Sequence, residues 1–121
     1  VLVLSSHTEQ PLVRRTLPEI GYHIVQEKLC QAAGRFYIFW RAEPGQADDW
    51  TAEEVHYGRL LWVQNPPKML LDYCRYRIKV MADRLTGLAS ATGDVSRIRG
   101  EIAAEIDFYQ RKITELEGAL C

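Results

Sequence analysis

The spacing of hydrophobic residues changes along the chain, and the first segment has the pattern of a strand followed by a helix. Residues 1–4 are continuously apolar, which predicts a strand buried on both faces. After a polar turn at residues 5–8, with Thr8 as N-cap, apolar residues recur at helical spacing until Gly21, which should end the helix. Pro18 should kink or shorten the last turn. The apolar helical positions are Leu12, Val13, Leu17 and Ile20.

Two segments rich in β-branched and aromatic residues come next. Residues 22–30 and 35–43 are separated by a short turn containing Gly34, which predicts a β-hairpin. The second arm has large apolar residues at consecutive positions, so we expect both of its faces to be covered. The order strand, helix, strand, strand is a parallel crossover that ends in an antiparallel hairpin, as at the edge of an α/β sheet.

The second half of the chain has the period of paired helices. Residues 44–49 break the composition, and residues 50–64 predict a helical turn and then a short extended piece. Asn65 should cap a long helix that begins at two prolines. Apolar residues then follow two heptad seams interrupted at residues 87–93, which predicts an antiparallel coiled-coil hairpin. The seams are Leu71, Cys74, Ile78, Met81, Leu85 and Leu88, and then Val95, Ile98, Ile102, Ile106, Tyr109, Ile113, Leu116 and Leu120.

Composition places this chain among globular proteins. Of its 121 residues 47% are hydrophobic and 26% charged, with a formal net charge of -1, so it should form a core. No apolar run approaches the roughly 18–20 residues of a membrane span. Three cysteines without CxxC spacing argue against a disulfide framework or a metal site and predict a cytoplasmic protein. Because the chain opens on Val1 without Met, we expect it to be the tail of something longer.

Few residues suggest chemistry. The glycines are never closer than six residues apart, so the chain has no phosphate-cradling or dinucleotide loop. Asn65-Pro66-Pro67 resembles the motif of methyltransferases that act on exocyclic amines, but the helix-cap interpretation is the stronger one. His7 follows the first strand, at the edge where open α/β sheets bind ligands, although a loop histidine satisfied by water is the plainer interpretation.

Charge is distributed unevenly. Residues 65–99 hold seven basic and three acidic side chains, a balance of +4, and the rest of the chain has a balance of -5. We place the basic residues of the first long helix outside the heptad seam. Tyr73 and Tyr76 lie among them. This pattern favours contact with a nucleic-acid backbone, and an ordinary solvated helix face fits it equally well. The candidate RNA-binding residues are Arg75, Arg77, Lys79, Arg84, Arg97 and Arg99.

Short segments in a fixed order carry a resemblance to a known family. They are Leu2-Val3-Leu4 before a polar turn, Leu12-Val13-Arg14-Arg15 and Leu17, Gly21-Tyr22-His23-Ile24-Val25, Gly34-Arg35-Phe36-Tyr37, Ala42-Glu43-Pro44-Gly45, Tyr57-Gly58 and Pro66-Pro67. In this order the chain resembles the C-terminal part of the bacterial tRNA (adenine-22-N1)-methyltransferase family, whose members use S-adenosylmethionine.

The resemblance implies a domain organisation and a function. Residues 1–45 would be the α/β end of a class I, Rossmann-like methyltransferase sheet, residues 46–64 a linker, and residues 65–121 a coiled-coil helical hairpin that contacts tRNA. Ser6 and His7 would lie near the substrate, although relatives have a Gln-Pro-Asn-like turn there. The cofactor loop and the catalytic residues would lie upstream, so we expect this chain alone to be inactive. A non-catalytic interaction or dimerisation module is the alternative.

Overall fold

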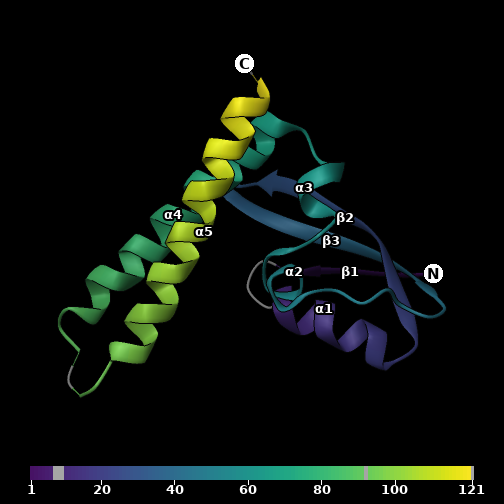
Figure 1. Cartoon of the computed structure of the whole chain (residues 1–121), viewed down its shortest axis with the longest axis horizontal. Helices are drawn as coiled ribbons and strands as arrows, with labels where there is room; N and C mark the ends of the chain where they lie inside the picture. The colour runs from purple at the N-terminus through teal and green to yellow at the C-terminus, as the bar shows by residue number, and fades with distance from the viewer. Residues whose placement is uncertain (7–9, 92, 121) are drawn as a thin grey trace. The chain divides into compact units, whose positions relative to one another are not determined.

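The computed structural model describes residues 1–6, 10–91 and 93–120, which fall into two compact units, Val1–Pro66 and Pro67–Cys121 (Figure 1). The first unit contains β1 (Leu2–Ser6), α1 (Gln10–Glu19), β2 (Tyr22–Ala32), β3 (Arg35–Pro44), α2 (Ala52–Tyr57) and α3 (Leu61–Gln64). The second unit contains α4 (Pro67–Leu88) and α5 (Ser96–Leu120).

The three strands form one sheet in the order β1-β3-β2, and both pairings are antiparallel. β1 and β2 therefore run parallel to each other, with β3 between them, so the predicted crossover and hairpin are confirmed. Ala33 and Gly34 both have positive φ, at 52° and 74°. This is the backbone of a tight hairpin turn whose twist matches that of its strands.

The sheet has one covered face and one open face. Phe36, Ile38 and Trp40 are buried on the side where α1 and α3 contact β2. On the other side Val3 is 64% exposed and Phe39 is 39% exposed. The prediction that the first strand and the second hairpin arm are covered on both faces is therefore wrong for the described residues, because the helices of this unit pack on one side only.

The helix α1 buries a different stripe from the one expected. It ends at Glu19, one residue after Pro18, and Gly21 follows with a φ of 84°. The proposed cap Thr8 lies outside the described residues. Leu17 is buried, but Leu12 and Ile20 are 49% and 56% exposed, and the other buried residues of the helix are Gln10 and Arg14.

The segment 46–64, expected to be a linker, contains two short helices of the first unit. α2 begins with a capping box, in which Thr51 Oγ1 accepts a hydrogen bond from Glu54 N–H and Glu54 Oε1 accepts one from Thr51 N–H. The short extended piece predicted around Leu61 and Val63 is instead the helix α3. Its first turn is stabilised by a side chain from β2, which spacing in the sequence could not reveal.

In the second unit α4 and α5 are antiparallel and pack along their lengths. Ion pairs join Arg77 to Glu105 and Arg75 to Glu117, and the rings of Tyr73 and Tyr109 meet edge to face at 5.9 Å. Leu85 and Ile98, both predicted seam residues, are partly exposed near the connecting turn. The buried side chains include Leu71, Cys74, Met81, Ile102, Phe108 and Tyr109.

Candidate functional site

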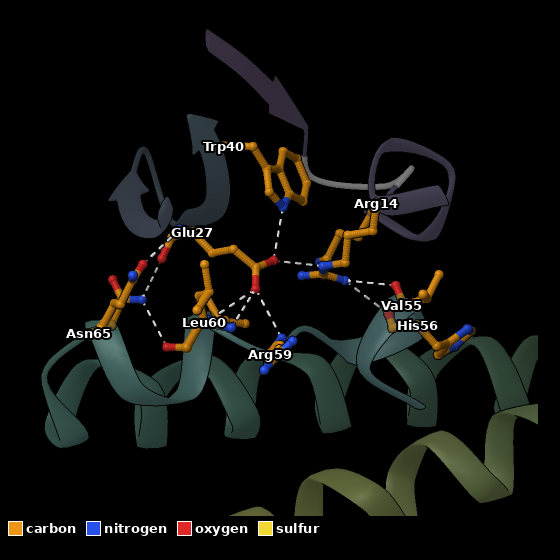
Figure 2. Close-up of polar contacts among 11 residues, drawn as sticks. Arg14, Glu27, Trp40, Val55, His56, Arg59, Leu60 and Asn65 are labelled. Atoms are coloured by element: carbon orange, nitrogen blue, oxygen red, sulfur yellow. Dashed lines mark hydrogen bonds and ion pairs between the residues drawn. The ribbon is translucent and has the colours of Figure 1, made fainter. Parts of the chain in front are cut away.

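A buried carboxylate lies at the centre of the first unit (Figure 2). The Glu27 side chain has no exposed surface. Its Oε2 accepts hydrogen bonds from Arg14 Nε at 2.7 Å and from Trp40 Nε1 at 2.9 Å. Its Oε1 accepts from three consecutive backbone N–H groups, those of Arg59, Leu60 and Leu61, at 2.9, 2.8 and 3.2 Å. One side chain thus joins α1, β2, β3 and the start of α3.

A break in the strand register places Glu27 on the covered face. Ile24 lies opposite Ala42, but Gln26 lies opposite Arg41, so Val25 is an extra residue in β2. Such a bulge moves all later side chains to the other face of the strand. Glu27 consequently lies opposite Trp40 and faces α1.

The ion pair satisfies backbone groups at two helix ends. α3 has no cap from its own N-terminal residue, and the Glu27 carboxylate binds the N–H groups there. Arg14 Nη1 donates to the carbonyls of Val55 and His56, in the last turn of α2, at 3.3 and 3.2 Å. An anion at the start of a helix and a cation at its end are both stabilised by the opposite partial charges of the backbone there.

The turn between α2 and α3 approaches this pair closely. Gly58 has a φ of 108°, and a Cβ there would lie 2.9 Å from Arg14 Nη2 and 3.1 Å from Leu61 Cβ. Gly58 is therefore required both by its backbone conformation and by the space available. The Arg14 guanidinium also lies 5.4 Å from the centre of the Trp40 ring.

The network positions a segment of chain, and hydrogen-bond donors occupy the whole Glu27 carboxylate. A carboxylate offers about four lone-pair directions, and the five donors around Glu27 use them fully. Arg14 and Glu27 are both fully buried, so neither oxygen of Glu27 faces solvent. We interpret this site as the anchor that holds the 46–64 segment to the sheet.

Two side-chain amides continue this anchor along the outer edge of β2. Gln64 Oε1 accepts from Glu27 N–H at 2.9 Å, and Gln64 Nε2 donates to Val25 O at 3.2 Å. Asn65 Oδ1 accepts from Leu29 N–H at 2.8 Å, and Asn65 Nδ2 donates to Glu27 O at 2.8 Å. Asn65 Nδ2 also donates to Leu61 O at 2.9 Å. The prediction that Asn65 caps the start of the long helix is wrong: its Oδ1 accepts from the backbone of β2, and Asn65 instead lies at the C-terminal end of α3, where it binds Leu61 O.

The predicted substrate-proximal residues are only partly described. Ser6 ends β1 and lies opposite Ile38 of β3. His7 lies outside the described residues.

The predicted RNA-binding residues divide into exposed and enclosed side chains. Arg75, Lys79, Arg84, Arg97 and Arg99 are exposed. Three of them lie beside acidic residues of their own helix: Arg75 near Asp72, Lys79 near Asp83 and Arg97 near Glu101.

Arg77 does not lie on the exposed face of α4, as the spacing predicts, but faces α5. It is only 17% exposed and pairs with Glu105 of α5 at 3.3 Å. Burial lowers the pKa of Arg77, but the neighbouring Tyr109, Tyr73 and Glu105 outweigh it, so the pKa is raised and the charge is retained. Tyr73, also expected among the surface residues, is buried. The heptad assignment failed here because the α4–α5 contact is wider than a two-position seam.

Two hollows of the first unit do not suit S-adenosylmethionine. A hollow of about 230 Å³ beside Arg14, lined also by His23, Asp48 and Trp50, is below the roughly 300–1,000 Å³ of typical ligand pockets. A second hollow, of about 320 Å³, is lined by aliphatic side chains and Thr16 and offers little to a ribose or a carboxylate. Within the described part of the chain, no three His, Cys, Asp or Glu side chains lie together as they would around a metal ion. None of the described helices is long and apolar enough to cross a membrane.

Known proteins resemble this chain in structure, whereas comparisons of sequence alone find no match. No family model and no curated protein matches the chain. Among solved structures it is similar to Sp1610 of Streptococcus pneumoniae, a candidate tRNA (m1A22) methyltransferase, with a TM-score of 0.72 and 20% identity over 93% of this chain and 48% of that one. The chain has the fold of half of such a protein.

Two further structures agree with this result. The B. subtilis m1A22 tRNA methyltransferase TrmK is 15% identical, with a TM-score of 0.67 over 93% of this chain and 50% of that one. A protein of the NADB-Rossmann superfamily from Streptococcus agalactiae is 19% identical, with a TM-score of 0.69 and 47% of its length covered. The chain thus spans about half the length of the structures it matches, and the resemblance to a C-terminal part of these methyltransferases is confirmed at the level of the fold.

Proposed function

We propose that this chain works as the C-terminal part of an S-adenosylmethionine-dependent tRNA (adenine-N1)-methyltransferase. The observation that carries the proposal is that tRNA (m1A22) methyltransferases match 93% of the chain, in both of its units, at TM-scores of 0.67 to 0.72. The first unit would supply the end of the catalytic sheet. The second would supply a helical pair that grips tRNA.

The chain's own residues limit its part in catalysis. The buried carboxylate of Glu27 is saturated with hydrogen-bond donors. The two described hollows do not suit the cofactor. We therefore expect no methyl transfer from this chain alone. The reaction belongs to a polypeptide that also contains the cofactor-binding half of the fold.

The tRNA contacts would come from the exposed basic residues. Arg77 is unsuited to bind phosphate, because its charge is already paired with Glu105 between the helices. Surface ion pairs are worth only about 0.2–1 kcal/mol, so an exposed pair such as Arg97 with Glu101 can be exchanged for a phosphate contact. Arg84 and Arg99 are exposed nearer the turn between α4 and α5.

Salt-dependent binding of a tRNA transcript tests this assignment. Replacing Arg84, Arg97 and Arg99 by Gln should weaken binding and reduce the slope of log K against log salt by about 2–3, since each lost phosphate contact removes about 0.7–0.9. The matched control replaces the exposed Lys28, Arg35 and Arg41 of the sheet by Gln, which removes the same charge. Equal losses in the two variants would contradict a specific role for the helical pair.

Methylation itself is tested with the longest polypeptide that contains this chain. Incubated with S-adenosylmethionine and tRNA, it should produce N1-methyladenine, detected as a stop in reverse transcription because the methyl group blocks the pairing edge of the base. The 121-residue chain should produce none under the same conditions. Absence of methylation by the longer polypeptide would remove the proposed function.

A further inference from the structure

A polar hollow lies at one end of the sheet in the first unit. Its walls come from α1, the start of β2, the segment that precedes α2, and Val55 of α2. Ile24 of β2 and Leu2 of β1 both pair with Ala42, so the hollow lies where these two strands begin. Its volume of about 230 Å³ exceeds the roughly 150 Å³ of a cavity that holds benzene. The hollow therefore suits one flat ring system better than a whole cofactor.

Three charged side chains surround this hollow. Arg15, Asp48 and Asp49 line it and are exposed. Within the described part of the chain, none of the three makes a hydrogen bond or an ion pair. The neighbouring Arg14, by contrast, is neutralised by Glu27. The hollow thus offers two carboxylates and one guanidinium to a ligand.

The ring of His23 forms part of the wall. This side chain is half-buried, and its Nδ1 is buried without a hydrogen-bond partner among the described residues. A Cβ at Gly45 would lie 3.1 Å from this atom, so the backbone encloses the ring on that side. Buried polar atoms are normally paired, and an unpaired one costs free energy. A polar ligand in the hollow would be placed beside this unsatisfied ring.

Trp50 gives the wall a flat surface. Its ring is half-buried, and the Arg59 guanidinium lies 5.9 Å from the ring centre. Pro18 and Ile24 add apolar surface to the same hollow. Proteins hold unpaired nucleobases by stacking them on aromatic rings and by hydrogen bonds to the edge of the base. An aromatic ring beside two carboxylates is a combination of this kind.

We propose that this hollow binds the guanine ring of a nucleotide. A carboxylate can accept two hydrogen bonds side by side, and guanine carries two adjacent donors, N1–H and the 2-amino group. In adenine, cytosine and uracil the corresponding edge alternates donors with acceptors. The guanine ring would stack on Trp50 and donate to Asp48 or Asp49. The phosphate would pair with Arg15. The proposal does not rest on the proposed function, because it concerns binding alone.

Titration of the 121-residue chain with guanosine 5′-monophosphate tests the site. In NMR spectra the indole N–H signal of Trp50, assigned with a Trp50→Phe variant, should shift and saturate. The indole signals of Trp40 and Trp62, which do not line the hollow, should shift less. Adenosine, cytidine and uridine monophosphates should bind at least about tenfold more weakly, because none of them matches a carboxylate with two adjacent donors.

Variants of the charged residues test the role of each. Replacing Asp48 and Asp49 together by Asn should weaken binding of guanosine monophosphate at least about tenfold, because charged acceptors make the stronger hydrogen bonds. Both side chains are exposed, so folding should tolerate the change. The matched control replaces the exposed Glu101 and Glu115 of α5 by Gln, which removes the same charge and should leave binding unchanged. Arg15→Gln should weaken binding of the monophosphate but leave binding of guanosine, which has no phosphate, unchanged.

The outcomes decide both the site and the source of the nucleotide. An unshifted Trp50 signal at millimolar guanosine monophosphate, equal binding of all four nucleotides, or binding that survives the double Asn variant would overturn the proposal. Tighter binding of the single-stranded RNA UUGUU than of the monophosphate, lost in the double Asn variant, would support the site and assign it to a nucleotide within RNA. Binding of the monophosphate without binding of that RNA would support the site and assign it to a free nucleotide.

Discussion

Replacing Glu27 by Gln should destabilise the first unit severely, although the two side chains have nearly the same size. The variant leaves the Arg14 guanidinium buried without its counter-charge. The Gln side chain also has an NH₂ group where Glu27 has an oxygen, and this group must face hydrogen-bond donors. These are either the Arg14 and Trp40 side chains or the three backbone N–H groups at the start of α3. Removing one partner of a buried ion pair costs about 3–5 kcal/mol. That is a large part of the roughly 5–15 kcal/mol by which a domain is stable.

The chain offers a selective probe for this measurement. Its three tryptophans, Trp40, Trp50 and Trp62, all lie in the first unit. Urea unfolding followed by tryptophan fluorescence therefore reports that unit. With a slope of about 1–3 kcal/mol per M, the loss should move the midpoint by at least about 1 M. Amide exchange at Arg59, Leu60 and Leu61 should accelerate more than at residues of β3.

A matched variant and a reversal test the reasoning. Glu53→Gln removes a charge from an exposed position in α2 and should change stability by less than about 0.5 kcal/mol. Combining Glu27→Gln with Arg14→Met removes both charges and should cost less than the sum of the single changes. An unchanged midpoint for Glu27→Gln, or strictly additive effects in the double variant, would refute the view that the pair acts as one buried unit.

Three further changes should have distinct results. Gly58→Ala should lower the free energy of unfolding in urea by about 1–3 kcal/mol, because φ is positive and the added Cβ would meet Arg14 and Leu61. The control Gly100→Ala, where a Cβ has open space in α5, should not destabilise the second unit. Asn65→Ala should accelerate exchange of the Leu29 amide and cost about 1–3 kcal/mol, and a slow Leu29 amide in that variant would contradict the edge role of Asn65. Burial raises the pKa of Cys74 from 9.0 to about 12, so at pH 8 the native thiol should resist alkylation and unfolding should expose it. The same shift makes the contribution of Cys74 to stability fall as pH rises from 9 toward 12, and rapid native labelling at pH 8 would show that the thiol is not enclosed.

Local sequence signals predicted the elements well, because those signals act over a few residues. The hairpin was visible in the β-branched segments on either side of Gly34, and the two long helices in their repeating apolar residues. The short helix α3 was missed since its first turn depends on Glu27, which lies more than thirty residues earlier. No pattern within residues 58–64 contains that information.

The site could not be predicted from the sequence, because it depends on one inserted residue. Simple alternation from Ile24 would place Glu27 on the open face, where a glutamate needs no explanation. The bulge at Val25 reverses that assignment and makes Glu27 the most enclosed acid among the described residues of the unit. The burial of Arg14 could not be predicted either, because an arginine beside Arg15 on an amphipathic helix usually faces water. A buried partner for it becomes visible only when β2 is in place.

The anchor around Glu27 also sets the order in which the first unit can mature as the chain is synthesised. Arg14, Glu27 and Trp40 emerge from the ribosome well before Leu61 and Asn65, and until then the carboxylate lacks three donors and the β2 edge lacks its amides. While some twenty-five further residues are added after Trp40, the polar groups of Glu27 and β2 therefore lack part of their hydrogen-bond partners. Closure of this unit is a late event that depends on its last residues, so a ribosome pause before Asn65 would prolong the exposure of an unfinished sheet.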